Sequence, residues 1–150
     1  MTRAARQSPS GRVNSALAVA SAEAGQTLSG TTTVAFPVAE TVIGPVTIDQ
    51  NVSTAFGAGT VFRAGRTGFW QAAVLLTYSG LITTGLLSVI PEGPAPTARA
   101  SGESTINPTF SAGGPAFLLE AGEGVFVVAL MGAARDVASA RASLGLVGLA

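Results

Sequence analysis

Residues 69–78, with the sequence FWQAAVLLTY, decide the fold class of this 150-residue chain. In an extended strand every second side chain points to the same face. One face of this segment is wholly apolar and the other is mixed, which predicts a strand that covers a sandwich or barrel core with one face. The apolar face consists of Trp70, Ala72, Val74, Leu76 and Tyr78, and the mixed face of Phe69, Gln71, Ala73, Leu75 and Thr77.

Short apolar segments separated by turn residues continue on both sides of this strand. Alternation over residues 33–38 predicts a strand at a sheet edge, because Pro37 cannot donate a hydrogen bond to a neighbouring strand. The continuous apolar run 125–131 predicts a buried central strand. The glycines of residues 122–124 predict a tight hairpin turn before that run.

The end of the chain continues the β pattern. A loop through Asp136 and a final strand over about residues 140–149 are expected, although residues 133–142 also admit a helix because Ala and Arg favour one. No convincing long helix and no repeat of fixed period occurs. The sequence therefore predicts an all-β fold, a jelly-roll β-sandwich of about eight to ten antiparallel strands.

The chain divides into an N-terminal arm, residues 1–29, and a jelly-roll domain, residues 30–150. The arm has no aromatic residue and few large hydrophobic residues, so it cannot form a core. It admits a short helix over residues 16–24. The arm is either a tail without function or a segment that becomes ordered on a partner. In the second case its basic residues are the candidate contacts: Arg3, Arg6 and Arg12.

The composition excludes most catalytic chemistry. The chain has no Cys, no His and no Lys, which removes thiolate, imidazole and Schiff-base mechanisms together with Cys and His metal sites. Glu120 and Glu123 are the one close acid pair and would be the catalytic carboxylates of a β-sandwich hydrolase. They flank a glycine turn, where exposed charge is usual. We therefore expect a protein that is not an enzyme and that holds no cofactor and no metal ion.

The charge content indicates how the surface is used. Charged residues make up 11% of the chain and the net charge is zero, whereas an average globular chain has about 25% charged residues. No overall field draws the protein to nucleic acid or to an anionic membrane, and no apolar run approaches the length of a membrane span. So little surface charge favours a chain that hides much of its surface against other subunits.

The aromatic residues are the candidate core. Spaced two apart within strands, they are expected to pack inside the sandwich, or across a subunit interface, where aromatic side chains are enriched. The residues assigned to this trimer or sandwich core are Phe62, Trp70, Tyr78, Phe117 and Phe126.

Three segments resemble one family. Residues 61–78 (VFRAGRTGFWQAAVLLTY), 115–132 (PAFLLEAGEGVFVVALMG) and 139–150 (SARASLGLVGLA) resemble strands of tumour-necrosis-factor-like jelly rolls, including complement globular heads. The chain departs from the complement heads at Leu144 and Leu146, where those heads usually have Phe, and it has an arm in place of a collagen-like stalk. The resemblance implies a tight homotrimer whose axis is lined with apolar and aromatic side chains.

A small jelly roll without Cys, His or Lys that carries an N-terminal arm also resembles phage virion proteins. This resemblance implies a homotrimeric decoration (cement) protein, made in the host cytoplasm, that binds the major capsid protein on the outer surface of a tailed-phage head. Arg3, Arg6 and Arg12 would then contact the capsid or a neighbouring trimer. The alternative in the same fold is the receptor- or glycan-binding head of a fibre or spike, with recognition in the loops at 65–68 and 91–96.

Overall fold

The computed structural model describes residues 15–79, 85–93, 98–104 and 109–150, and within these ranges it contains eleven β-strands and no helix. The predicted all-β jelly roll is confirmed. The helices considered over residues 16–24 and 133–142 are wrong, since both segments are strands. The strands are β1 (Leu17–Glu23), β2 (Thr27–Thr33), β3 (Val38–Ile43), β4 (Val46–Thr54), β5 (Gly57–Ala64), β6 (Gly68–Tyr78), β7 (Gly85–Pro91), β8 (Ala100–Ser104), β9 (Thr109–Gly113), β10 (Phe117–Leu119) and β11 (Gly124–Leu149).

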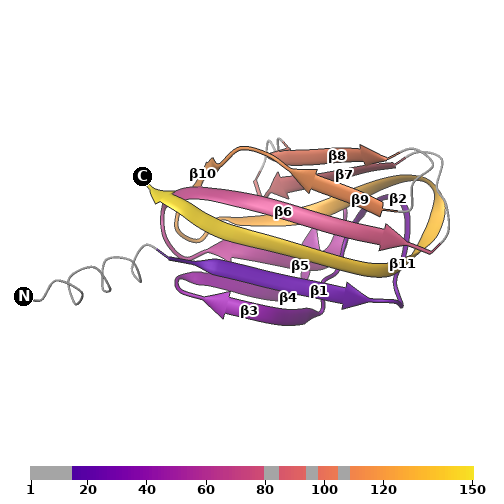
Figure 1. Cartoon of the computed structure of the whole chain (residues 1–150), viewed down its shortest axis with the longest axis horizontal. Helices are drawn as coiled ribbons and strands as arrows, with labels where there is room; N and C mark the ends of the chain where they lie inside the picture. The colour runs from indigo at the N-terminus through magenta and orange to yellow at the C-terminus, as the bar shows by residue number, and fades with distance from the viewer. Residues whose placement is uncertain (1–14, 80–84, 94–97, 105–108) are drawn as a thin grey trace, which may run out of the picture.

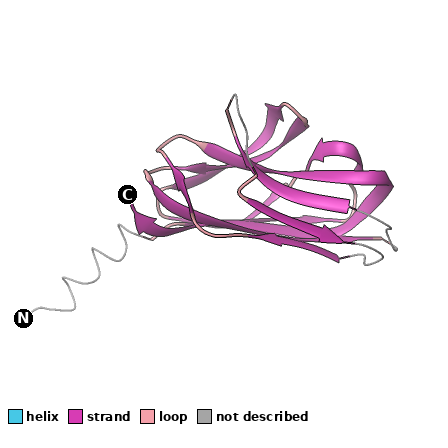
Figure 2. Ribbon diagram, turned by 90° about the horizontal axis from the view of Figure 1, so that it is seen from above, coloured by secondary structure: helices cyan, strands magenta, loops and turns pink. Residues whose placement is uncertain are grey.

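The strands form two facing layers (Figures 1 and 2). The front layer has the order β3-β1-β11-β6, and both β9 and β10 pair with the outer edge of β6. The back layer has the order β8-β7-β11-β5-β4, and β2 pairs with β11 beside β5. Because β11 belongs to both layers, hydrogen bonds join all the strands into one sheet.

Strand β11 is 26 residues long and crosses from one layer to the other. Its first part pairs with β7, β5 and β2, and its last part pairs with β6 and β1. The predicted loop through Asp136 is wrong. Asp136 pairs with Thr27 of β2, and the Thr27 hydroxyl donates a hydrogen bond of 2.6 Å to the Asp136 carboxylate. Register shifts on either side of this pair let the strand bend and stay hydrogen-bonded.

Strand β1 corrects the predicted arm over residues 1–29. It lies between β3 and β11 in the front layer, and its Ala18 and Ala20 are fully buried in the core. The inward-facing residues of β1 are alanines, so a segment without large inward hydrophobic residues still contributes to the core. Residues 1–14 lie outside the described ranges.

The predicted edge strand over residues 33–38 is also wrong. Strand β2 ends at Thr33, β3 begins at Val38, and the segment between them is irregular. Its Val34 and Phe36 are nevertheless completely buried. The Phe36 N–H donates to the Thr60 hydroxyl at 2.7 Å, so the alternating pattern reflects burial of a connecting segment whose backbone is satisfied by a side chain.

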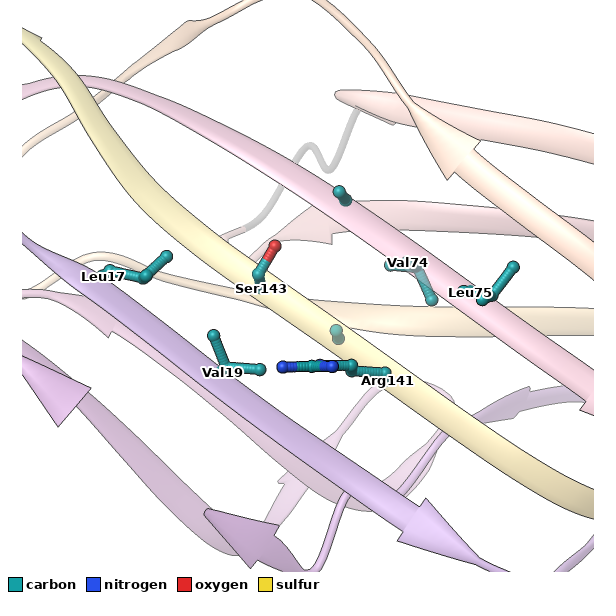
Figure 3. Close-up of a pocket in the computed structure, with 8 residues that line it drawn as sticks. Leu17, Val19, Val74, Leu75, Arg141 and Ser143 are labelled. Carbon is teal, nitrogen blue, oxygen red and sulfur yellow. The ribbon is translucent and has the colours of Figure 1, made fainter. Parts of the chain in front are cut away.

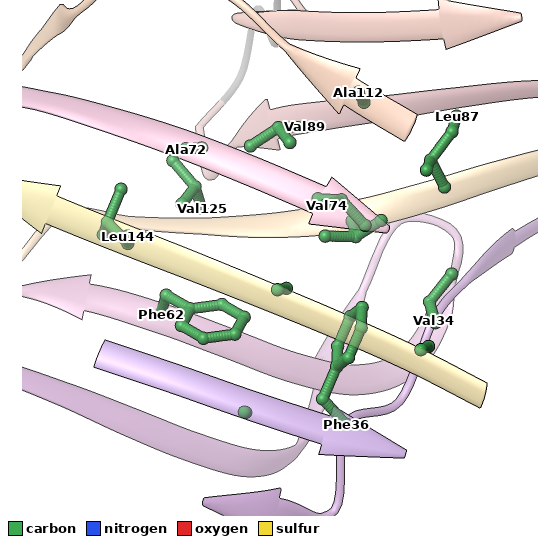
Figure 4. Packing of buried hydrophobic residues seen from close by; sticks show 14 of the residues in the cluster. Val34, Phe36, Phe62, Ala72, Val74, Leu87, Val89, Ala112, Val125 and Leu144 are labelled. Atoms are coloured by element: carbon green, nitrogen blue, oxygen red, sulfur yellow. The ribbon is translucent and has the colours of Figure 1, made fainter. Parts of the chain in front are cut away.

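The core lies between the layers (Figure 4). The predicted alternation of β6 is confirmed, since its apolar face is buried and its mixed face is largely exposed. Trp70 is 0% exposed, and its indole N–H donates to the Arg66 carbonyl at 3.3 Å. The Tyr78 ring packs edge-on against Phe110, with ring centres 5.3 Å apart. These contacts fix which face of β6 remains outside.

Candidate functional site

The acid pair considered for catalysis stabilises a turn. The Glu123 carboxylate accepts a hydrogen bond of 2.7 Å from the backbone N–H of Glu120, and both residues are exposed. Gly122 between them has a φ of 94°, a conformation that favours glycine. The described residues contain no group of three or more Asp, Glu, His or Cys side chains that could hold a metal ion. The geometry therefore gives this pair a structural task.

Arg63 on β5 is the centre of the main ion-pair network. Its guanidinium contacts Asp49 at 2.9 Å and Glu92 at 2.6 Å, and it donates to the Gly122 carbonyl at 2.9 Å. The hydrogen bonds to Glu92 and then to Asp49 raise the pKa of Arg63 above its ordinary value. The network ties β4 and the turns after β7 and before β11 to one side chain, so it braces one end of the sandwich.

The outward side of the front layer is the principal exposed apolar surface, and we call it the front face. Cross-strand pairing brings its residues into rows. Val19 lies opposite Ser143, which lies opposite Ala73, and in the next row Arg141 lies opposite Leu75. The apolar residues on this face include Leu17 and Val19 of β1, Ile43 of β3, Phe69, Ala73 and Leu75 of β6, Leu118 of β10, and Val147 of β11.

The front face is hollowed at its centre. Two adjoining shallow depressions, of about 390 and 450 Å³, share Leu17, Ala73 and Ser143 in their walls. They exist because small residues occupy the middle of the rows while larger side chains stand around them. Figure 3 shows Ser143 between Leu17 on one side and Leu75 on the other. A surface of this shape suits an inserted apolar side chain better than it suits a polar ligand.

Arg141 is the charged side chain at the centre of the front face. Its guanidinium lies 3.3 Å from the carboxylate of Glu40 on β3. Figure 3 shows the Arg141 side chain extended from β11 alongside Val19. Arg141 thus has an acidic partner within the chain, and covering the face need not leave its charge unpaired.

The structure shows where the five predicted aromatic residues lie within a single chain. Phe62, Trp70, Tyr78 and Phe117 are buried between the layers of a single chain. Phe126 is buried too, but on the outer side of the back layer, where it packs in a second cluster with Val61 and Val128. All five side chains are thus buried within the single chain, and whether any of them also contributes to a trimer stays a prediction.

The front face includes residues that the sequence argument did not select. Leu75 and Phe69 lie on the mixed face of β6. The apolar residues of that face were the one feature of the sequence that could have indicated this exposed surface. Leu17 and Val19 were missed because they fall in the segment interpreted as an arm. The basic candidates Arg3, Arg6 and Arg12 lie outside the described residues, so their role remains a prediction.

Comparison with known proteins identifies the fold. No protein-family model matches the chain, and a search of curated proteins finds no match. Within the described ranges, no helix is long and apolar enough to cross a membrane. The chain is similar to Eiger TNF from S. frugiperda, at 12% identity and a TM-score of 0.65, over 90% of this chain and 95% of that chain.

Two further structures give the same result. Murine APRIL at pH 8.0 has 14% identity and a TM-score of 0.66, with 89% of this chain and 98% of that chain covered. The globular domain of zebrafish complement 1qA has 14% identity and a TM-score of 0.58, with 88% and 96% covered. At such identities the likeness concerns the fold alone. The chain has the jelly-roll fold of the tumour-necrosis-factor and complement globular domains.

Proposed function

We propose that this chain is a non-catalytic structural protein that assembles as a homotrimer through its front face and decorates the outer head of a tailed phage. The front face carries the proposal. It is rich in exposed apolar residues, it is hollowed, and its central charge, Arg141, is paired within the chain, in a sequence with only 11% charged residues. Exposed apolar patches of this kind mark sites of protein association.

A closed threefold ring is the assembly that fits this face. A ring of three requires a head-to-tail contact, in which one surface of a protomer packs against a different surface of the next. The depressions around Ala73 and Ser143 provide one half of such a contact. The resemblance to trimeric jelly rolls supports three as the number of subunits.

The composition and organisation of the chain support the decoration role. A protein that clamps a capsid needs a symmetric oligomer, surface complementarity and an arm, and it needs no chemistry. A trimer matches a threefold or quasi-threefold capsid position by symmetry. In this proposal Arg3, Arg6 and Arg12 contact the capsid or a neighbouring copy.

The assembly is tested by a matched pair of substitutions. Leu75 is 51% exposed on the front face, and Leu130 is 46% exposed on the outer side of the back layer. Leu75→Glu is expected to give a monomer of 14.8 kDa in light scattering, whereas Leu130→Glu is expected to keep a mass of about three chains. A Leu75→Glu protein with the same mass as Leu130→Glu would refute the front face as the interface.

The decoration role is tested on phage heads that lack the protein. Purified protein is expected to bind them, at hundreds of copies per particle in sets of three. Heads that take up no protein would refute the role. Uptake of only a few tens of copies or fewer would refute decoration as well, because that number indicates a fibre or spike head.

A further inference from the structure

The outer side of the back layer carries a groove distinct from the front face. It has a volume of about 240 Å³ and lies between residues 53–56, at the β4–β5 turn, and residues 91–93, after β7. Its aromatic lining is Phe56 and Phe126, whose ring centres are 6.3 Å apart and tilted by 45°. Phe126 is nearly fully buried and forms the floor, while Phe56 is half-buried. The groove therefore offers aromatic surface to an incoming side chain.

The charged residue in the lining of this groove is Glu92. Its Oε1 is held by Arg63 at 2.6 Å, but its Oε2 lies 3.4 Å from the other terminal nitrogen of that guanidinium, at the long limit of a hydrogen bond. Arg63 is also shared with Asp49 at 2.9 Å. Two carboxylates and one guanidinium leave this corner with a charge of −1, and Oε2 keeps capacity to accept a hydrogen bond.

Aromatic faces beside an underused carboxylate suit a guanidinium. Arginine stacks on aromatic rings and pairs with carboxylates through a planar fork of donors. The chain already contains one such stacking contact, since the guanidinium carbon of Arg99 lies 6.0 Å from the centre of the Phe117 ring.

The chain also supplies the cations. Residues 1–14 contain Arg3, Arg6 and Arg12 and no acid, a side-chain charge of +3. All eight acids and the other five arginines lie in residues 15–150, which leaves that part of the chain with −3. This division of charge favours binding of the basic segment to the remainder of the protein.

Residues 1–14 join the described part of the chain at the end of the sandwich that carries Glu92. Ser15 contacts Gly44, and the next residue, Pro45, accepts a hydrogen bond from the Gly65 N–H. At the same end, the N–H of Ala64 donates to the Glu123 carbonyl, and the N–H of Glu92 donates to the carbonyl of Gly124. Fourteen fully extended residues span at most about 45–50 Å, which is the reach of this segment from Ser15.

We propose that the groove between residues 53–56 and 91–93 binds an arginine side chain from residues 1–14 of this chain. The guanidinium lies against Phe56 and Phe126 and donates to Oε2 of Glu92. This inference deepens the proposed function, because it names the surface that receives the basic segment. It does not depend on the trimer, since the front face and the groove lie on opposite layers.

Disulfide trapping tests the proposal, because the full-length chain has no Cys of its own. Ser8→Cys is combined with Ser53→Cys at the groove, and in the control with Ser29→Cys on β2, which is also exposed and lies off the front face. The groove pair is expected to cross-link at least about tenfold faster at low salt, because binding raises the effective concentration of the two thiols. Gel mobility shows whether the bond joins one chain or two, and either result supports the proposal.

The charges are tested in the same assay. Replacing Arg3, Arg6 and Arg12 by Gln is expected to reduce the groove pair to the rate of the control pair, and so is Glu92→Gln. Urea unfolding of the arginine variant checks that it is as stable as the wild type, so that loss of folding does not explain the effect. Equal rates for the two pairs, or a groove rate that the arginine replacements leave unchanged, would overturn the proposal whatever the mass of the assembly.

Discussion

Replacing Tyr78 with phenylalanine is expected to stabilise the protein. The side chain is 2% exposed, and its hydroxyl is the one buried side-chain polar atom in the described part of the chain that has no hydrogen-bond partner. A buried donor without a partner costs about 1–3 kcal/mol relative to one in water. Phenylalanine keeps the edge-on contact with Phe110 and removes only the hydroxyl.

The size of the effect follows from these contacts. The ring volume and its packing do not change, so no cavity term opposes the gain. We expect the free energy of unfolding to rise by about 1 kcal/mol at neutral pH. For a chain of this length, that corresponds to an increase in Tm of about 2–4 °C.

The same hydroxyl also makes the free energy of unfolding depend on pH in the alkaline range. Burial raises the pKa of Tyr78 well above its ordinary value near 10. Unfolded tyrosine therefore loses its proton above about pH 10 while the folded side chain keeps it, so stability falls by up to about 1.4 kcal/mol for each further pH unit. The chain has one Tyr, no Lys and no Cys, so no other side chain titrates between about pH 9 and 12.

The assay is urea unfolding followed by the fluorescence of Trp70, the single, fully buried tryptophan. Both proteins are measured at one protomer concentration, because assembly adds to apparent stability. The wild type is expected to lose stability between pH 10 and 12, and Tyr78→Phe to lose much less. A variant about 1 kcal/mol less stable than wild type at neutral pH, or two identical alkaline profiles, would refute the argument.

Three further predictions concern local structure and pH. Gly44 has a φ of 72°, and an added Cβ would overlap the Ser15 carbonyl. Gly44→Ala should therefore lower the free energy of unfolding by about 1–3 kcal/mol. The control Gly148→Ala, whose added Cβ meets open space, should change it by less than about 0.5 kcal/mol. Arg63→Met removes both ion pairs and should cost about 1 kcal/mol at low salt and less at high salt; a cost independent of salt would contradict an electrostatic role. With no His in the chain, unfolding free energies between about pH 6 and 8 should agree within about 0.5 kcal/mol, and a midpoint near pH 6.5 would contradict this.

The sequence predicted strands best where side chains alternate or are uniformly apolar. Strand β6 was identified with the correct inward face because its apolar residues recur at every second position. The run 125–131 was expected to be a buried central strand, and it is buried except for Leu130, which is 46% exposed. Two clusters account for this burial. Val127 faces the main core, while Phe126 and Val128 are covered by the second cluster.

The prediction failed where burial and partners depend on distant segments. Ala18 and Ala20 are small enough to resemble a tail, yet they are buried because β3 and β11 lie on either side of them. Asp136 resembles a loop residue, yet pairing with Thr27 and a backbone hydrogen bond from Ser79 hold it in a strand. Such long-range pairings leave no local pattern in the chain.

The candidate site was predicted in outline and misplaced in detail. The low charge content drew attention to surface that other subunits could cover, and that coverage stays a prediction. The aromatic residues chosen for that surface are core residues, since large aromatic side chains are what the space between two layers requires. The exposed apolar face instead uses Leu17, Leu75 and small residues between them, which resemble ordinary strand residues in one dimension.

The mass of the wild-type chain in solution tests the central claim most directly. Light scattering coupled to size exclusion, at several protein concentrations, is expected to give one species of about 44 kDa, three times the 14.8 kDa chain. A mass of 14.8 kDa at every concentration would mean that the front face stays exposed to water, and it would contradict assembly through that face.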